Sequence, residues 1–157
     1  METLEIEIID NGKRISLRGC LNENSGPPLN DCLKTMKTIC HIDLRGIDKI
    51  NSIGIGIWLD FTKKAAINSN LILESCSPDF IYQMNMISNF RENVTVNSCM
   101  RYFSCEACNF ESTKEYKALV HYNENGVMIA NSNCERCGET VEFGETDDEF
   151  FHFARRE

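Results

Sequence analysis

Apolar and polar residues alternate near the start of the chain in a pattern that predicts two short strands. Residues 4–8 read Leu-Glu-Ile-Glu-Ile, so every second side chain is apolar, as in a strand with one buried face. Residues 15–17 repeat the alternation after segment 10–13, whose Asn-Gly pair is typical of a tight hairpin turn. We therefore expect the chain to begin with an antiparallel hairpin.

Three longer stretches place apolar side chains at helical spacing, which predicts amphipathic helices. The first spans residues 28–39, and Pro28 suits its first turn because proline fixes φ near the helical value. The second begins after Asn51 and Ser52, whose side-chain oxygens are of the kind that cap a helix N-terminus. The third follows Ser77 and has its apolar positions at Phe80, Ile81, Met84, Ile87 and Phe90.

Short apolar runs between these helices have the length of strands, at 42–44, 71–74 and 94–96. A turn rich in Gly and Asp is expected over 45–50. Strands that alternate with helices predict an α/β fold in which amphipathic helices cover a mixed sheet.

The composition changes near residue 100, so we predict a first domain over 1–99 and a second module over 100–157. Whether the two share a core or swing on the connection at 97–101 stays open. In the second module we expect strands at 116–122, 127–129 and 141–143. Thr146 and Glu149 have capping-box spacing, which predicts a last helix carrying Phe150, Phe151 and Phe153.

Four of the nine cysteines form two Cys-x-x-Cys pairs, which are Cys105 with Cys108 and Cys134 with Cys137. Each pair precedes a residue that tolerates positive φ, Asn109 or Gly138, as a tight metal-binding turn requires. Two such turns can hold one Zn²⁺ ion with four thiolates, so we predict a zinc-ribbon-like β module. Four thiolate ligands leave no open position, and the zinc is therefore expected to be structural.

Other interpretations of the cysteines remain open. The pairs could be unrelated redox or buried pairs, although the βαβ context of a thioredoxin-type motif is missing around Cys105. Lower-ranked substitute ligands are Cys99, His121 and His152. The remaining cysteines, Cys20, Cys32, Cys40 and Cys76, are expected as small core residues.

The net charge of −8 is concentrated in the second module: it is −2 over residues 1–100 and −6 over residues 101–157. Because nucleic-acid binders need a basic face, no nucleic-acid partner is expected. No apolar run approaches the roughly 20 residues that span a bilayer, and the start of the chain lacks an apolar signal segment. Together with the many cysteines, these features predict a cytoplasmic protein without a membrane span.

The expected start of the second helix carries a recognisable motif, Asn51-Ser52-Ile53-Gly54-Ile55-Gly56. It resembles the Asp-Ser-Ser/Thr-Gly-apolar-Gly motif of the STAS domain, the fold of bacterial anti-sigma factor antagonists. Three further segments, over 19–22, 43–44 and 71–78, resemble that family's Gly-x-Leu-Asp turn, its central Asp-Leu and the strand and helix start after the motif. The resemblance covers residues 3 to about 100.

The resemblance implies a bacterial regulatory module that binds proteins and is not an enzyme. Its partner would be an anti-sigma factor that is also a kinase, or a sensory complex. In the antagonists this kinase phosphorylates the Ser after the Asp, which releases the antagonist, and Ser52 occupies that position. A phosphate there would meet free N–H groups and the positive end of the helix dipole. This chain departs from the motif at Asn51 and Ile53.

The alternative is that Asn51 or Ser52 only caps the helix, in a constitutive scaffold subunit. A small-ligand sensor with a cleft near 51–56 is a further alternative, and a nucleic-acid-associated zinc-ribbon protein is less favoured. No nucleophile–base pair, phosphate-binding loop or histidine cluster indicates an enzyme. Trp58 is expected in the core, whereas Ile57 and Phe61 fit either the core or a partner surface.

Overall fold

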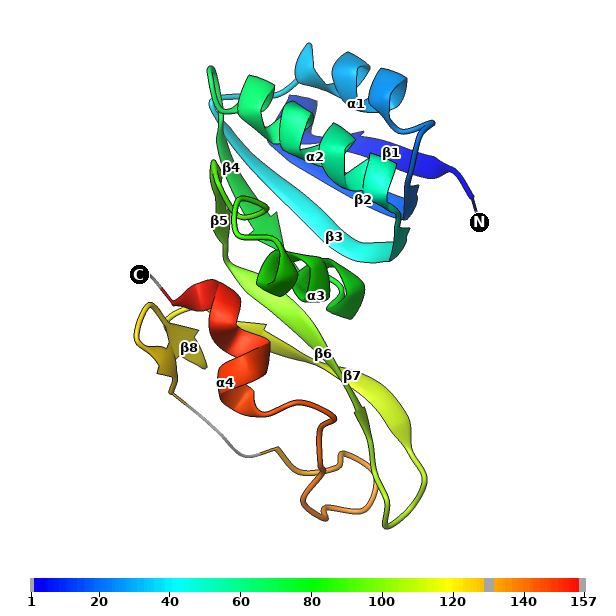
Figure 1. Ribbon diagram of the computed structural model, residues 1–157, viewed down its shortest axis with the longest axis vertical. Coiled ribbons are helices and arrows are strands. Elements are labelled where there is room, and N and C mark those ends of the chain that lie inside the picture. The colour runs from blue at the N-terminus through cyan, green and yellow to red at the C-terminus, as the bar shows by residue number, and fades with distance from the viewer. Residues whose placement is uncertain (1, 129–131, 156–157) are drawn as a thin grey trace.

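The computed structural model describes residues 2–128 and 132–155, which form two units arranged end to end (Figure 1). Five strands of the first unit form one sheet in the order β1-β2-β3-β4-β5. The first pair is antiparallel and the other pairs are parallel, so the sheet is mixed, as predicted. The strands are β1 (Leu4–Ile9), β2 (Arg14–Leu21), β3 (Ile39–Ile50), β4 (Asn70–Glu74) and β5 (Val94–Val96).

Three helices connect the parallel strands and lie on one face of the sheet (Figure 1). They are α1 (Gly26–Leu33), α2 (Ser52–Ala65) and α3 (Pro78–Met86). Each crossover advances one strand in the same direction, and right-handed crossovers of this kind place all helices on the same face. The strands bury alternate apolar side chains beneath them, such as Ile42 and Leu44 of β3. No helix in the described part of the chain has the length and apolar character needed to cross a bilayer.

The N-terminal hairpin is confirmed, and its turn is the 3₁₀ segment η1 (Asp10–Gly12). Asp10, Asn11 and Gly12 all have positive φ there. The capping prediction for the third helix is also confirmed, because the Ser77 hydroxyl accepts a hydrogen bond from the backbone N–H of Phe80 at 3.3 Å. The predicted extent of this helix is wrong, because it ends at Met86 and leaves Ile87 and Phe90 beyond its end; Phe90 is buried from the turn that follows.

Two further sequence predictions in the first unit are wrong. The first helix ends at Leu33, and Ile39, expected on its apolar face, instead begins β3 with 54% of its surface exposed. The expected turn over 45–50 is strand, because β3 continues beside β2 to Ile50 through two register shifts. Gly46 allows the Arg18 side chain of β2 to pack directly on the β3 backbone, since an added Cβ would lie 2.3 Å from Cγ of Arg18.

The second unit is built on a long antiparallel hairpin and a short C-terminal helix. Its elements are β6 (Ser98–Ser104), β7 (Glu111–Lys117), β8 (Tyr122–Asn123), β9 (Gly126–Val127), α4 (Asp147–Phe150) and the 3₁₀ segment η2 (Phe151–Ala154). The Thr146 hydroxyl caps α4 by accepting from the N–H of Glu149 at 3.2 Å, as the capping box predicts. Phe150, Phe151 and Phe153 are buried.

The strands of this unit differ from the sequence predictions. A continuous strand over 116–122 is wrong, because β7 ends at Lys117 and Leu119 adopts a φ of 66° before β8 begins. Only isolated bridges form in the region of 141–143, including one between Ser104 and Glu142. Ile129 of the predicted return strand lies outside the described residues. The strand β6 has no counterpart among the strands predicted from the sequence.

The two units share one buried core, which answers the question left open about the connection. Only Asn97 separates β5 from β6, and Cys76 pairs with the start of β6 through hydrogen bonds to Ser98 and from Met100 of 3.1 and 2.8 Å. Five aromatic residues of the second unit belong to the same buried cluster as the sheet: Tyr116, Tyr122, Phe150, Phe151 and Phe153. The boundary between 99 and 100 stays a prediction, and β6 runs across it.

Candidate functional site

The two Cys-x-x-Cys segments form turns with the same hydrogen bonds. The N–H of the residue after each second cysteine donates to the carbonyl oxygen of the first cysteine, at 2.8 Å for Asn109 and 2.9 Å for Gly138. Both residues have positive φ, 60° and 79°, as expected from the sequence. The N–H of each first cysteine donates to the carbonyl oxygen five residues later, in Phe110 or Glu139. Each turn thus directs its two thiols to one side.

The four thiols of Cys105, Cys108, Cys134 and Cys137 converge, with all their sulfur atoms within 4.8 Å of one another. Across the two turns, Sγ of Cys105 lies 3.6 Å from Sγ of Cys137, and Sγ of Cys108 lies 3.6 Å from Sγ of Cys134. A tetrahedron of sulfurs about 2.3 Å from a central ion has edges of about 3.8 Å. These separations therefore fit a four-coordinate metal ion and exceed the roughly 2 Å of a disulfide.

The thiols of Cys134 and Cys137 have different pKa values. Burial raises the pKa of Cys134. The N–H donors of Cys137 and Arg136 and the neighbouring thiols lower it by more, so the pKa falls to about 7. The N–H of Glu139 lowers the pKa of Cys137, yet burial and three adjacent thiols raise it to about 12. Of these two thiols, Cys134 loses its proton at the lower pH, and a cation would favour the loss of protons from its thiol ligands.

A small apolar cluster supports the thiol site. Phe103, Cys105, Cys134 and Val141 are buried together, with Phe110 and Phe143 packed against them. The site is asymmetric, because Cys137 is exposed.

The substitute ligands lie outside the thiol cluster. Cys99 is fully buried beside Cys76, with which it forms an isolated β-bridge, and burial raises its pKa. Nδ1 of His121 accepts a hydrogen bond from the N–H of Lys117 at 2.9 Å. The carbonyl group of His152 accepts from Arg91. The remaining cysteines, Cys20, Cys32, Cys40 and Cys76, are buried in the first unit, as expected.

The N-terminus of α2 presents the second candidate site. Oδ1 of Asn51 caps the helix by accepting from the N–H of Gly54 at 2.8 Å, so Asn51 is the N-cap residue. Ser52 is the first residue of the helix and is exposed, and Ile53 beside it is 56% exposed. A hydroxyl and an aliphatic side chain are therefore accessible at this helix end.

Glu23 is a neighbour of this site that sequence analysis missed. Its Oε2 accepts a hydrogen bond from Nδ2 of Asn51 at 3.0 Å, which fixes the orientation of the capping amide. A backbone hydrogen bond and this bond lower the pKa of Glu23, so the carboxylate stays charged. The sequence offered no signal, because Glu23 lies in a loop 28 residues before Asn51.

The side chains of the motif helix are divided between core and surface. Trp58 is buried against the rings of Phe61 and Phe80, with centroid separations of 5.4 and 5.1 Å. Phe61 thus belongs to the core, although it also lines a hollow of about 370 Å³ between α1 and α2. Ile57 is half-buried and lines the same hollow, together with the exposed residues Ile53 and Gly56.

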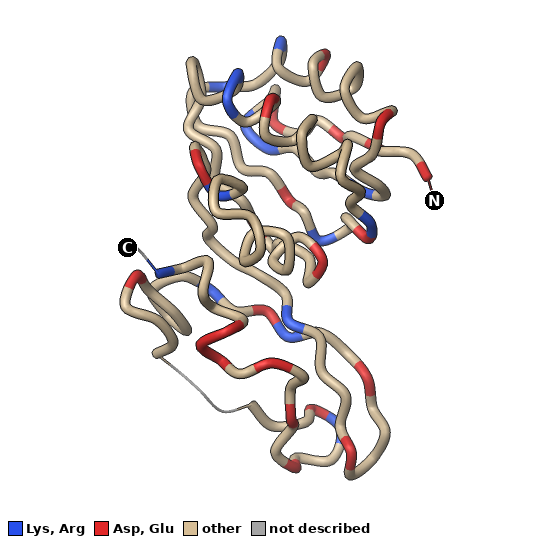
Figure 2. The backbone as a smooth tube through the Cα atoms, viewed as in Figure 1, with Lys and Arg blue, Asp and Glu red and all other residues tan. Residues whose placement is uncertain are grey.

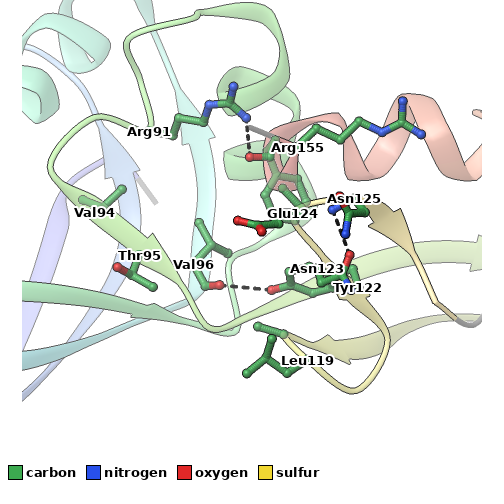
Figure 3. Close-up of a pocket in the computed structure, with 13 residues that line it drawn as sticks. Arg91, Val94, Thr95, Val96, Leu119, Tyr122, Asn123, Glu124, Asn125 and Arg155 are labelled. Atoms are coloured by element: carbon green, nitrogen blue, oxygen red, sulfur yellow. Dashed lines mark hydrogen bonds between the residues drawn. The ribbon is translucent and has the colours of Figure 1, made fainter. Parts of the chain in front are cut away.

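Two further hollows lie elsewhere on the described part of the chain. One, of about 700 Å³, lies beside Asn51 and includes Cys20, Asp48 and Asp79 in its lining. The other, of about 740 Å³, lies between β5, the β8–β9 hairpin and the end of the described chain (Figure 3).

The arginines of the hollow in Figure 3 are already paired. Arg91 donates to the carbonyl oxygens of His152 and Phe153, and Arg155 donates to Asp148 at 2.6 Å. The Tyr122 hydroxyl also donates to the carbonyl oxygen of Val96, at 3.3 Å. The bonds of Arg91 and Val96 connect the first unit to the second, so the hollow lies at the interface between the two units.

Comparison with protein-family models finds no family that matches the chain, and comparison with curated proteins finds no matching relative.

Proposed function

We propose that this protein is a non-enzymatic regulatory module that binds a partner protein at the N-terminus of α2, as an anti-sigma factor antagonist does. In this proposal, phosphorylation of Ser52 switches the binding. The observation that carries it is an exposed serine at the first position of a capped helix, following a parallel strand of an α/β sheet. A kinase needs an accessible hydroxyl, and Ser52 supplies one.

The local charges favour a switch. A phosphate on Ser52 would bring nearly two negative charges to a helix end whose Gly54 N–H is already used by the cap. The Glu23 carboxylate, held by Asn51, would repel the phosphate. The same charge would stand beside Ile53 and the hollow between α1 and α2. A partner that buries an apolar group in this hollow would lose affinity, because it would also remove water from the charged phosphate.

We further propose that the four converging thiolates hold one structural Zn²⁺ ion in a zinc-ribbon-like module. The residues that would hold it are Cys105, Cys108, Cys134 and Cys137. Thiolate ligands in tetrahedral arrangement suit zinc, and a metal would cross-link a hairpin tip that has only a small apolar cluster of its own.

The alternative function is a constitutive scaffold. Asn51 supports it, because a capping amide stands here where the resembling family's motif has an aspartate. A small-ligand sensor using the hollow beside Asn51 is the other alternative.

Substitution of Ser52 separates the switch from the scaffold. A partner is first captured with the wild-type protein from its own cells, and binding is then measured with purified components. Ser52→Glu is expected to weaken binding at least tenfold or so, whereas Ser52→Ala and the exposed control Ser88→Glu keep it. Equal binding by wild type and Ser52→Glu would leave the scaffold as the function.

A further inference from the structure

A groove between the two units combines exposed aromatic and aliphatic side chains. It lies between α3, β6 and the segment that leads into α4, and its volume is about 530 Å³, within the range of binding pockets. Tyr82, Met86 and Tyr102 line it, with exposed fractions of 61%, 63% and 50%. Large apolar side chains gathered at one groove mark an interaction surface more strongly than the same residues scattered singly. The groove shares no lining residue with the hollow between α1 and α2.

The wall of this groove holds a buried acceptor without a donor. Nδ2 of Asn85 donates to the carbonyl oxygens of Glu149 and Phe150, at 3.3 and 2.8 Å. Those bonds fix the orientation of the amide and leave Oδ1 buried, with no hydrogen-bond partner among the described residues. Oδ1 is closed to solvent, so the amide of Asn85 holds α3 against the segment that enters α4 and gives this side of the groove a fixed wall.

The charges around the groove have one sign. Its lining, as far as the chain is described, contains the carboxylates of Asp79, Glu145 and Glu149 and no Lys or Arg side chain. Figure 2 shows acidic residues following one another along the segment that enters α4. Glu145 pairs with the buried Arg101 on the inner side, while Glu149 is exposed. The groove therefore offers acceptors, negative charge and aromatic rings together.

We infer that this groove binds a segment of a partner protein in which a Lys or Arg side chain stands next to an aliphatic one. The cationic group meets the carboxylates and the exposed rings of Tyr82 and Tyr102. Its alkyl stem and the aliphatic neighbour pack on Met86, whose flexible thioether adapts to such contacts. This surface is separate from the Ser52 site, and its test does not depend on phosphorylation.

The probe is a synthetic amphipathic peptide of Lys and Leu, compared with a counterpart in which Glu replaces every Lys. Binding to the full chain is measured by fluorescence anisotropy at physiological salt, and the site is located by amide chemical shifts. The Lys peptide is expected to bind and to shift amides of α3, Tyr102 and 144–150. Combined Tyr82→Ala and Tyr102→Ala substitution is expected to weaken binding about tenfold or more, because exposed aromatic anchors dominate such interfaces.

Matched controls separate the groove from general attraction to an acidic protein. Glu149→Gln removes one charge at the groove and is expected to weaken binding about threefold, whereas Glu7→Gln removes the same charge from β1 and leaves it unchanged. Leu119→Ala, at a position 80% exposed elsewhere, is also expected to be neutral. Equal affinity for the Glu peptide, shifts outside the groove, or wild-type affinity in the double tyrosine variant would each overturn the inference.

Discussion

Two glycines in the first turns of α2 have different structural roles. A Cβ added to Gly54 would lie 2.0 Å from the carbonyl oxygen of Leu21, whereas one added to Gly56 would meet no atom within 4 Å. Gly54 therefore allows α2 to approach the end of β2 closely. Gly56 leaves open space beside the hollow between α1 and α2.

The two glycines give a matched pair of substitutions. Gly54→Ala is expected to lower the free energy of unfolding by about 1–3 kcal/mol, because helix and strand must move apart. Gly56→Ala is expected to raise it by up to about 1 kcal/mol, since Ala favours a helix over Gly. Urea unfolding followed by Trp58 fluorescence measures both, and a loss of stability in both variants would contradict this account.

Arg101 is a charged residue at a core position, with 1% of its surface exposed. Its guanidinium donates to the carboxylates of Glu145 and Asp147 at 3.0 and 2.6 Å and lies 3.6 Å from the ring centroid of Phe143. These contacts tie β6 to the segment that begins α4.

Replacing Arg101 should therefore loosen the C-terminal segment. Arg101→Met is expected to lower the free energy of unfolding by about 2–4 kcal/mol, because two neighbouring carboxylates lose their counter-ion. The loss is not larger because both carboxylates are partly exposed, so water can solvate them once Arg101 is removed. Arg18→Met removes an exposed pair with Glu5 and should change stability by less than about 1 kcal/mol. Similar denaturation curves for the two variants would argue against a structural role for Arg101.

At the scale of elements, the two cysteine turns are expected to depend on a metal. One Zn²⁺ per chain is expected in native mass spectra of the protein. Cys137→Ser should abolish the bound ion, whereas Cys20→Ser, outside the cluster, should retain it. Chelation should disorder the turns at 105–110 and 134–139 and spare the five-stranded sheet, which amide hydrogen exchange would detect. Retention of zinc by Cys137→Ser would contradict a four-thiolate site.

Zinc affinity should also depend on pH in a defined direction. The thiolates bind the metal, and Cys134, with a pKa of about 7, is the last of the perturbed thiols to be protonated as the pH falls. Affinity is therefore expected to decrease as the pH is lowered from about 8 to about 5. Competition with a chromophoric chelator measures it, and a pH-independent affinity would be inconsistent with thiolate ligands.

Local signals predicted the elements that local contacts stabilise. The caps at Asn51, Ser77 and Thr146 and the paired cysteine turns could be read from the sequence because the atoms involved lie within a few residues of one another. The strand β6 could not, since a buried Arg101 breaks its apolar pattern and its carboxylate partners lie 44 and 46 residues away.

The same limit explains the missed end of β3 and the missed Glu23. Gly46 and Asp48 resemble turn chemistry, and only the neighbouring strand β2 makes that segment extended. Glu23 reaches Asn51 through a contact between a loop and a helix start far apart in sequence. The four thiols differ from these cases, because the spacing within each cysteine pair did predict that they converge.

At the scale of the whole molecule, the aromatic residues of the C-terminal segment join the two units. The Tyr122 hydroxyl donates to the carbonyl oxygen of Val96 in β5 at 3.3 Å, and the Phe151 ring, 1% exposed, packs on the Tyr122 ring with centroids 5.3 Å apart. Trp58, the only tryptophan, is in the same buried cluster but in the first unit. It can therefore report whether the units unfold together.

Phe151→Ala is expected to lower the free energy of unfolding by about 3–5 kcal/mol and to shift the Trp58 fluorescence transition by the same amount. Leu119→Ala, at an exposed position of the second unit, should leave the transition in place. A Trp58 transition that stays unchanged in Phe151→Ala would show that the units unfold independently, contrary to the shared core.

The central claim is that phosphorylation of Ser52 controls partner binding. The most direct test isolates the protein from its own cells, separates the partner-bound pool from the free pool, and quantifies the Ser52 phosphopeptide in each by mass spectrometry. The account predicts that the phosphopeptide is abundant in the free pool and depleted from the bound pool. An unmodified Ser52 in both pools, or equal phosphorylation in the two, would contradict it.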